Sequence, residues 1–230
     1  MLRILIAGGA LLASCAASAE ARQYDWTLED RGETREAVTR YSSDVDGQAI
    51  DAFRGVAEVP YSMPAVLAAI LDTDGFRDWI FGFKTVEKRP IADEPTSLYL
   101  AFHATWPAKD RDVVVVGDMD IDVFSGVVQI HSRHAPEAPE RSGHVRIEEL
   151  DNRWILTPLD NGWTRIDFRT FVDIGGWVPG WLANMVATDT PYQTLEGLRK
   201  RLDEANYRFP HIEDIPFLPE GNWFNDKTQE

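Results

Sequence analysis

The sequence predicts an α+β fold in which a curved antiparallel β-sheet wraps around a long C-terminal α-helix. Short alternating strands are separated by turn signals. Asn161-Gly162 is the strongest of these, because a type I′ hairpin turn needs a positive φ at both central residues. A short helical segment at 62–74 interrupts the strands, and apolar side chains at 177–206 recur along one helical stripe. These patterns place one short helix within the run of strands and one long helix after it.

Three strands are predicted before the first helix, at residues 26–29, 35–41 and 49–59. Asp46-Gly47 is a hairpin turn signal between the second and the third strand. Pro60 ends the third strand, because proline has no N–H to donate to a neighbouring strand. The chain therefore opens with a small antiparallel section.

A short amphipathic helix follows these strands. Ser62 is a good N-cap residue, and Pro64 lies in the first helical turn, where its missing N–H costs nothing. Asp74-Gly75 ends the helix. The apolar residues between these ends, at helical spacing, are Val66, Leu67, Ile70 and Leu71.

Strand patterns dominate the middle of the chain. The first four candidates are 83–89, 98–105, 112–124 and 127–132, and a polar loop at 134–144 follows them. Three more candidates, at 145–150, 154–158 and 163–172, form a predicted three-strand meander. Its turns are expected at Asp151-Asn152 and at Asn161-Gly162.

The long helix is predicted at 177–206, after Gly175-Gly176 breaks the last strand. Pro191 removes a helical hydrogen bond, so we expect a kink or break at 188–190, with Thr190 as the N-cap of a new start. The stripe consists of Trp181, Met185, Tyr192, Leu195, Leu198 and Leu202.

Composition excludes several classes of protein. The 230 residues are 44% hydrophobic, which is enough for a sizeable core in one domain or two small ones. The formal net charge of -15 argues against a nucleic-acid-binding protein and against electrostatic docking on an anionic membrane. One cysteine excludes a disulfide scaffold and a cysteine-rich zinc site. The class of protein that remains is a folded chain with a sizeable hydrophobic core.

Residues 1–19 have the order of a secretory signal peptide: a charged start, an apolar run too short to span a bilayer, and the small residues Ala17-Ser18-Ala19. Cleavage after Ala19 would leave no thiol, which suits an oxidising compartment. Leu12-Ala13-Ser14-Cys15 also resembles a bacterial lipobox, in which Cys15 would be acylated. Both routes predict an exported protein, either periplasmic or secreted, with a lipid anchor on Cys15 in the second case.

The element order is the helix-grip arrangement, and four local sequences in that order resemble the START domain, a lipid-transfer module. They are FRGVAEV at 53–59, WPAKDRD at 106–112, GWVPGWLAN at 176–184 and LRKRL at 198–202. The resemblance covers about residues 24–205. It divides the chain into the signal peptide, a lipid-binding domain at 24–206 and a proline-rich tail at 207–230.

The resemblance implies a deep apolar tunnel between sheet and C-terminal helix that holds a lipid or another hydrophobic small molecule, with the helix and nearby loops as a cover. We further expect no cofactor, no nucleic-acid partner, a monomer and transient contact with a membrane. Arg111 would meet a lipid head group or form a structural bridge, and Gly117 stands where some sterol-binding members have an arginine. The candidate ligand-binding residues are Phe102, Trp106, Arg111, Trp154, Phe168, Trp177, Trp181 and Met185.

Other interpretations remain open on the residues alone. The same aromatic residues would also fill an ordinary packed core. A helix-grip enzyme, of cyclase or hydrolase type, could use His103 as a general acid–base. The tail 207–230 could bind a partner, or it could pack back on the domain through Phe209, Ile212, Phe217, Trp223 and Phe224.

Metal sites have little support in the sequence. Asp118, Asp120 and Asp122 alternate as on one wet face of a strand, and the glycine and glutamate that a calcium loop requires are missing. His131, His134 and His144 lack the further ligands that would complete a zinc site.

Overall fold

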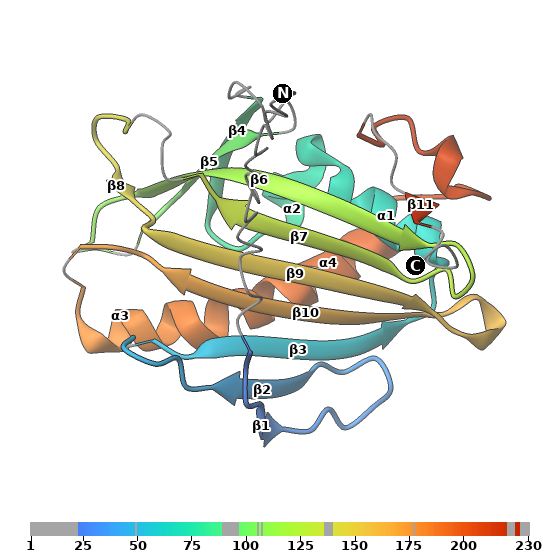
Figure 1. The fold of residues 1–230 in the computed structure, drawn as a ribbon, viewed down its shortest axis with the longest axis horizontal. Coiled ribbons are helices and arrows are strands. Elements are labelled where there is room, and N and C mark those ends of the chain that lie inside the picture. Colours follow the sequence, from blue (N-terminus) through green and yellow to red (C-terminus); the bar gives the residue numbers. More distant parts are fainter. Residues whose placement is uncertain are drawn as a thin grey trace, which may run out of the picture.

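The structure is a computed structural model, and it describes residues 23–48, 50–88, 97–104, 106, 108–135, 140–176, 178–219 and 224–225. The predicted signal peptide, Cys15 and Trp177 lie outside these residues. The described chain forms one curved antiparallel sheet with helices against one of its faces (Figure 1). This confirms the predicted fold class.

The sheet follows the order β1-β2-β3-β10-β9-β7-β6-β5-β4, and it is not closed. Two short strands, β8 (Val145–Arg146) and β11 (Phe224–Asn225), pair with β6 in parallel. The other strands are β1 (Thr27–Asp30), β2 (Thr39–Ser43), β3 (Ala52–Val59), β4 (Phe83–Lys88), β5 (Leu98–Phe102), β6 (Arg111–Asp122), β7 (Val128–His134), β9 (Glu149–Pro158) and β10 (Thr164–Asp173).

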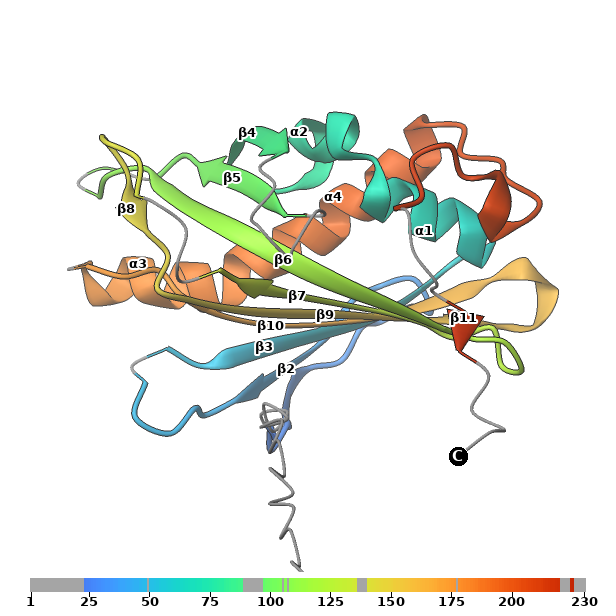
Figure 2. The same cartoon turned by 45° about the horizontal axis from the view of Figure 1, so that its top comes forward.

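The helices gather over the concave face of the sheet, and α4 crosses it diagonally beside α1 and α2 (Figure 2). The α-helices are α1 (Met63–Leu71), α2 (Phe76–Trp79), α3 (Gly180–Asn184) and α4 (Thr190–Glu204). The other helical turns are η1 (Thr73–Gly75), η2 (Asp160–Gly162), η3 (Met185–Asp189) and η4 (Ile212–Asp214). None of the helices in these described ranges is long and apolar enough to cross a membrane.

Two glycines let the C-terminal half of the long helix approach its neighbours closely. A Cβ on Gly55 of β3 would lie 2.3 Å from Cδ1 of Leu195, and a Cβ on Gly197 of α4 would lie 2.3 Å from the carbonyl oxygen of Trp79. A side chain at Gly197 would require the backbone of α2 or α4 to shift, and one at Gly55 would require the side chains of Leu195 and Phe53 to move. Leu195, Leu198 and Leu202, which are at most 3% exposed, are held in the core there.

The two predicted turns of the meander have different outcomes. Asn161 and Gly162 have φ values of 69° and 74°, which confirms the turn expected there. The turn expected at Asp151-Asn152 is wrong, because β9 runs without a break from Glu149 to Pro158. Strands on both sides pair with β9 along this stretch, and this pairing outweighs the local turn preference of Asp-Asn.

The predicted break in the long helix takes another form. Met185–Asp189 forms a π-helical turn between α3 and α4, directly before Pro191. Thr190 is not an N-cap, because the preceding Asp189 already has helical φ and ψ values of -80° and -40°. The wide turn accommodates the hydrogen bond that is missing because proline has no N–H, so the chain stays helical from 180 to 204.

The first part of the tail packs back on the domain. Ile212 and Ile215 are 8% and 3% exposed, and Phe209 contacts the same core. Tyr207 anchors the start of this segment, because its hydroxyl donates a hydrogen bond to Asp72 at 2.6 Å. Phe217, also expected to pack, is 37% exposed, and Trp223 lies outside the described residues.

Candidate functional site

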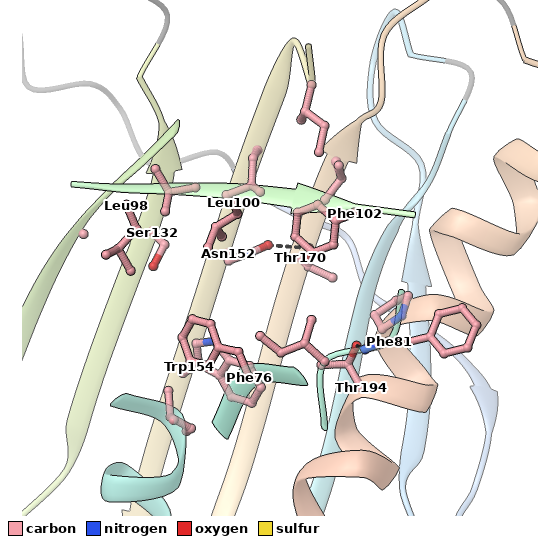
Figure 3. Close-up of a pocket in the computed structure, with 18 of the residues that line it drawn as sticks. Phe76, Phe81, Leu98, Leu100, Phe102, Ser132, Asn152, Trp154, Thr170 and Thr194 are labelled. Atoms are coloured by element: carbon pink, nitrogen blue, oxygen red, sulfur yellow. Dashed lines mark hydrogen bonds between the residues drawn. The ribbon is translucent and has the colours of Figure 1, made fainter. Parts of the chain in front are cut away.

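A cavity of about 890 Å³ lies between the concave face of the sheet and the helices. Its walls come from β5, β6, β7, β9 and β10 on one side, and from α2, η3 and the start of α4 on the other. The close-up in Figure 3 shows side chains from these elements converging on one space. The volume is within the range of about 300–1,000 Å³ that is common for small-molecule sites.

Aromatic rings form a connected series along this cavity. Trp154 stacks on Phe168 with 4.0 Å between ring centroids, and meets the edge of Trp79 at 6.1 Å. Such offset and edge contacts between rings are favourable beyond the apolar area that they bury. The series runs through Phe168, Trp154, Trp79, Phe76, Phe83 and Phe102, and therefore links β10 to β5 through α2.

A row of small and polar residues crosses the same face of the sheet. The strand register pairs Gly117 with Ser132, Ser132 with Asn152, and Asn152 with Thr170, and all four residues line the cavity. The Thr170 hydroxyl donates a hydrogen bond to Oδ1 of Asn152 at 2.5 Å, drawn as a dashed line in Figure 3. The row therefore brings uncharged hydrogen-bonding groups into an otherwise apolar wall.

Arg111 begins β6 at the far end of the cavity and is 6% exposed. Its guanidinium donates hydrogen bonds to the backbone carbonyls of Lys109, Ile174 and Gly175. Burial lowers the pKa of Arg111, although the group stays charged because an arginine starts from so high a value. These contacts tie the loop after β10 to the start of β6, so Arg111 has a structural role whether or not a ligand is bound.

Comparisons with known proteins agree with this architecture. The model of the START domain family matches residues 9–208. The chain belongs to the START domain family. An uncharacterised protein of Pseudomonas aeruginosa is 31% identical over 183 residues, which cover 78% of this chain and 88% of that protein.

Two further START proteins have descriptive names. The crystal structure of the STAR-related lipid transfer protein of Xanthomonas axonopodis superposes with a TM-score of 0.67 at 28% identity, covering 77% of this chain and 98% of that chain. The phosphatidylcholine transfer protein of Mus musculus is 28% identical over 131 residues, 54% of this chain and 60% of that protein.

The structure brings together most of the residues that the START resemblance pointed to. Phe102, Arg111, Trp154, Phe168 and Met185 all line the cavity. Whether they contact a ligand stays a prediction.

The other three predicted residues are tryptophans, and the structure describes the side chain of only one of them, Trp106. The placement of Trp106 in the interior is wrong, because its side chain is 84% exposed on the loop between β5 and β6. Residues in a turn have no strand alternation to direct them inward. Trp177 lies outside the described residues, and for Trp181 in α3 only the backbone is described.

His103, the acid–base candidate of the enzyme interpretation, lies just after β5 at the rim of the cavity. Its side chain is 64% exposed, and Nδ1 is 3.8 Å from Oδ2 of Asp110. The same carboxylate accepts a hydrogen bond from Lys84 at 2.6 Å and another from the Ala104 N–H. These two hydrogen bonds lower the pKa of Asp110. The rim therefore carries a paired carboxylate rather than a buried acid–base group.

Two of the three histidines considered for metal binding, His131 and His134, have separate partners, and both ring nitrogens of His144 are buried without a hydrogen bond in the described part of the chain. Nε2 of His131 lies 2.7 Å from Oδ1 of Asp151, and Nδ1 of His134 accepts a hydrogen bond from the Leu150 N–H at 3.4 Å. Within the described ranges, no group of three or more His, Cys, Asp or Glu residues could hold a metal ion.

Sequence reasoning missed several residues of the cavity. Asn152 was assigned to a turn, and Ser132 and Thr170 were assigned only to strands. The alternation 150-152-154 and 168-170-172 could have found Asn152 and Thr170, because both share a face with predicted aromatic residues. The tail also lines the cavity, through Pro216, Phe217, Leu218 and Pro219.

Proposed function

We propose that this protein binds a lipid or another hydrophobic small molecule in its cavity and carries or presents it in the bacterial envelope. The observation that carries the proposal is the 890 Å³ space between sheet and helices, walled by aromatic and aliphatic side chains. A void of this size sacrifices packing contacts that a filled core would make, so a bound apolar guest restores them. The names of two START relatives, a STAR-related lipid transfer protein and a phosphatidylcholine transfer protein, support the same role.

The proposed role is non-enzymatic. His103 is largely exposed at the rim, and the polar row across the sheet consists of the uncharged side chains of Ser132, Asn152 and Thr170. A hydroxyl nucleophile needs a base within hydrogen-bond reach, and the Thr170 hydroxyl is hydrogen-bonded to the amide of Asn152. The residues that line the cavity serve to shield the guest from water.

The test is to purify the protein from cells, extract it with organic solvent and identify the extract by mass spectrometry. We expect one class of hydrophobic molecule at near-stoichiometric amount. A titration of the emptied protein with fluorescent lipids would then give an affinity, and a transfer assay between donor and acceptor vesicles would measure carriage. An empty extract together with no binding in the titration would remove the proposal.

The variant Gly117→Leu tests whether the lipid is bound in the cavity, because it puts a side chain into that space. A Cβ at this position would lie 3.6 Å from Oγ of Ser132 and from the His131 carbonyl oxygen, which is ordinary van der Waals contact. The variant should therefore fold but yield little extracted lipid. A lipid that co-purifies equally with both proteins would be bound outside the cavity.

We also propose that the chain is exported, by cleavage after Ala19 or by acylation of Cys15. Cell fractionation and the mass of the mature protein distinguish the two routes. Cleavage at Ala19 gives an N-terminal Glu20, whereas acylation leaves the chain starting at lipid-modified Cys15. A cytoplasmic protein that retains residue 1 would contradict both.

Transient membrane contact and a monomeric state complete the proposal. Trp106 supports the first, because it is 84% exposed on a loop whose neighbours His103 and Ala104 line the cavity. Tryptophan favours the boundary between water and lipid. Flotation with liposomes of neutral phosphatidylcholine should recover the protein, and Trp106→Ala should reduce that recovery. Light scattering tests the monomer.

A further inference from the structure

The polar row of the cavity is flanked by apolar rows on the same sheet face. The neighbouring row on one side contains Met119, Ile130, Trp154 and Phe168, which are paired across β6, β7, β9 and β10. The other side contains Val115, Leu150 and Val172; His134, which the register pairs with Val115, also falls in this row but does not line the cavity. Residues two apart on a strand are separated by about 7 Å. The uncharged hydrogen-bonding side chains that line the cavity from β7, β9 and β10 thus form a narrow band between rows whose lining residues are apolar.

The band carries no charge. Among the described residues, the charged side chains that reach the lining lie at its edges. Lys88, Asp51 and Asp118 are exposed. Arg111 lies six residues before Gly117 on β6, about 20 Å away along the strand, and is bonded to backbone carbonyls. An ion placed at the band would therefore lose its hydration without meeting a counter-charge.

Asn152 keeps hydrogen-bonding capacity for a guest. Its Oδ1 accepts the hydrogen bond from Thr170, and its Nδ2 makes no hydrogen bond within the described part of the chain. An amide has an oxygen that accepts and a nitrogen that donates, and Thr170 occupies only one of them. Figure 3 shows Asn152, Ser132 and Thr170 together, with Leu98, Leu100 and Phe102 on one side and Trp154 and Phe76 on the other.

Gly117 extends this opening. Because it has no side chain, the space beside Oγ of Ser132, 3.6 Å from where a Cβ would stand, is left to the cavity. The Ser132 hydroxyl can donate or accept a hydrogen bond in that space.

We infer that the cavity selects lipids whose polar group is uncharged, a hydroxyl or a carbonyl of a ketone, ester or amide, and that Nδ2 of Asn152 donates a hydrogen bond to the oxygen of this group. This inference deepens the proposed function and rests on it. The apolar rows hold the hydrocarbon on both sides of the oxygen. A fatty acid anion or a phosphocholine lipid is bound more weakly, because its charge would have to lie at the uncharged band.

The experiment compares three probes with the same C14 chain: 1-tetradecanol, tetradecanoate at pH 8 and tetradecylphosphocholine. Binding is followed by the tryptophan fluorescence of the full chain, below the concentration at which each probe aggregates, since Trp79 and Trp154 line the cavity. We expect 1-tetradecanol to bind at least about tenfold more tightly than either charged probe. Tetradecanoate or tetradecylphosphocholine as the tightest ligand would overturn the inference.

The variant Asn152→Leu/Thr170→Val removes both partners of the Thr170–Asn152 hydrogen bond, so neither is left unsatisfied. It should weaken 1-tetradecanol about tenfold and leave tetradecanoate within twofold. Gln129→Leu is the matched control, because Gln129 is exposed on β7 and does not line the cavity. Unchanged affinity for 1-tetradecanol in the double variant would contradict the role of Asn152.

The two levels of the proposal fail in different ways. If no probe changes the fluorescence of the wild type and no lipid is extracted, the proposed function itself fails. If the probes bind without the expected order, the function stands and the inference falls. Should the double variant not fold, Asn152→Asp keeps the size and the hydrogen bond from Thr170, and its added charge should weaken 1-tetradecanol at least about tenfold. Full affinity in that variant would also contradict the inference.

Discussion

The two faces of the same strands differ in how their polar groups are satisfied. On the convex face, away from the helices, Asp167 accepts paired hydrogen bonds from Arg54 at 2.7–3.0 Å and from Arg169 at 2.9–3.1 Å. On the concave face, the next polar position along β10 is Thr170, whose hydroxyl donates a hydrogen bond to Asn152. On the convex face, charged groups satisfy one another. On the concave face, the polar row is uncharged and has hydrogen-bonding groups left for a guest.

This difference separates stability from binding. The convex carboxylates bind arginines, so losing one leaves buried charge without a partner. The concave row surrounds a space, so changes there alter what the space accepts more than whether the sheet forms. The predictions below test this division, starting from the largest expected effect.

Asp167→Ala should cost about 2–3 kcal/mol of unfolding free energy. Asp167 is 8% exposed, and its removal leaves both arginines without their carboxylate. The cost is at the low end for a buried pair, because the side chains of Arg54 and Arg169 keep 25% and 31% exposure. Urea denaturation measures it, with Glu33→Ala at an exposed position as control. A loss below 0.5 kcal/mol would mean that the convex network contributes little.

The stability of the protein should decrease at acidic pH because the Asp167 carboxylate becomes protonated. Burial alone would raise the pKa of Asp167, but the hydrogen bonds and charges of Arg169 and Arg54 outweigh it and lower the pKa. A lowered folded-state pKa stabilises the protein above the unfolded-state pKa, and this contribution disappears as the pH falls through the folded-state value. Urea denaturation from pH 7 to 3 should therefore show a steeper decline for the wild type than for Asp167→Asn. Parallel curves would contradict this assignment.

Gly117→Leu should lower ligand affinity at least tenfold, which corresponds to about 1.4 kcal/mol, without loss of stability. The new side chain occupies the space beside Ser132, and the backbone at Gly117 needs no positive φ. Titration with 1-tetradecanol measures the affinity, and thermal denaturation measures the stability. An affinity equal to that of the wild type would mean that the guest does not reach the polar row.

Tyr207→Phe should cost about 1 kcal/mol of stability by loosening the tail from the domain. Tyr207 donates to Asp72 at 2.6 Å and accepts a hydrogen bond from Nε of Arg201 at 3.1 Å. Burial and the neighbouring Asp72 raise the pKa of Tyr207 to about 12, so the hydroxyl stays a donor at neutral pH. Chemical denaturation measures the loss, and hydrogen exchange of residues 208–218 should become faster. Unchanged exchange would show that other contacts hold the tail.

Affinity for 1-tetradecanol should change by less than about twofold between pH 6 and pH 9. The groups of the polar row, which are two hydroxyls and an amide, do not titrate in this range. Fluorescence titration at several pH values measures this, with tetradecanoate as the comparison. A large pH effect on the alcohol would place a titrating group beside the guest.

The parts of the fold that could be predicted depend on local signals. The Asn161-Gly162 turn and the stripe containing Leu195, Leu198 and Leu202 are readable within a few residues, and the structure confirms both. Asn152 was not readable in this way, because Asp-Asn favours a turn locally while the pairing of β9 with β7 and β10 is set by distant strands.

The candidate site was predicted in part for the same reason. Trp154 and Phe168 alternate on strands, and so their inward direction follows from the pattern. Trp106 lies in a loop, where a motif gives the position in the chain but not the direction of the side chain. The tail residues that line the cavity have no periodicity that would place them there.

The close approaches at Gly55 and Gly197 lie where the long helix stops lining the cavity. They clamp the C-terminal half of the long helix, and the helix residues that face the space are all earlier, at Leu182, Met185–Ala187, Thr190, Pro191 and Thr194. The first half of the helix therefore faces a guest, and the second half, with Leu195, Leu198 and Leu202 in the core, holds the helix against β3 and α2. A change in the first half should alter which guests fit, and a change in the second half should alter stability.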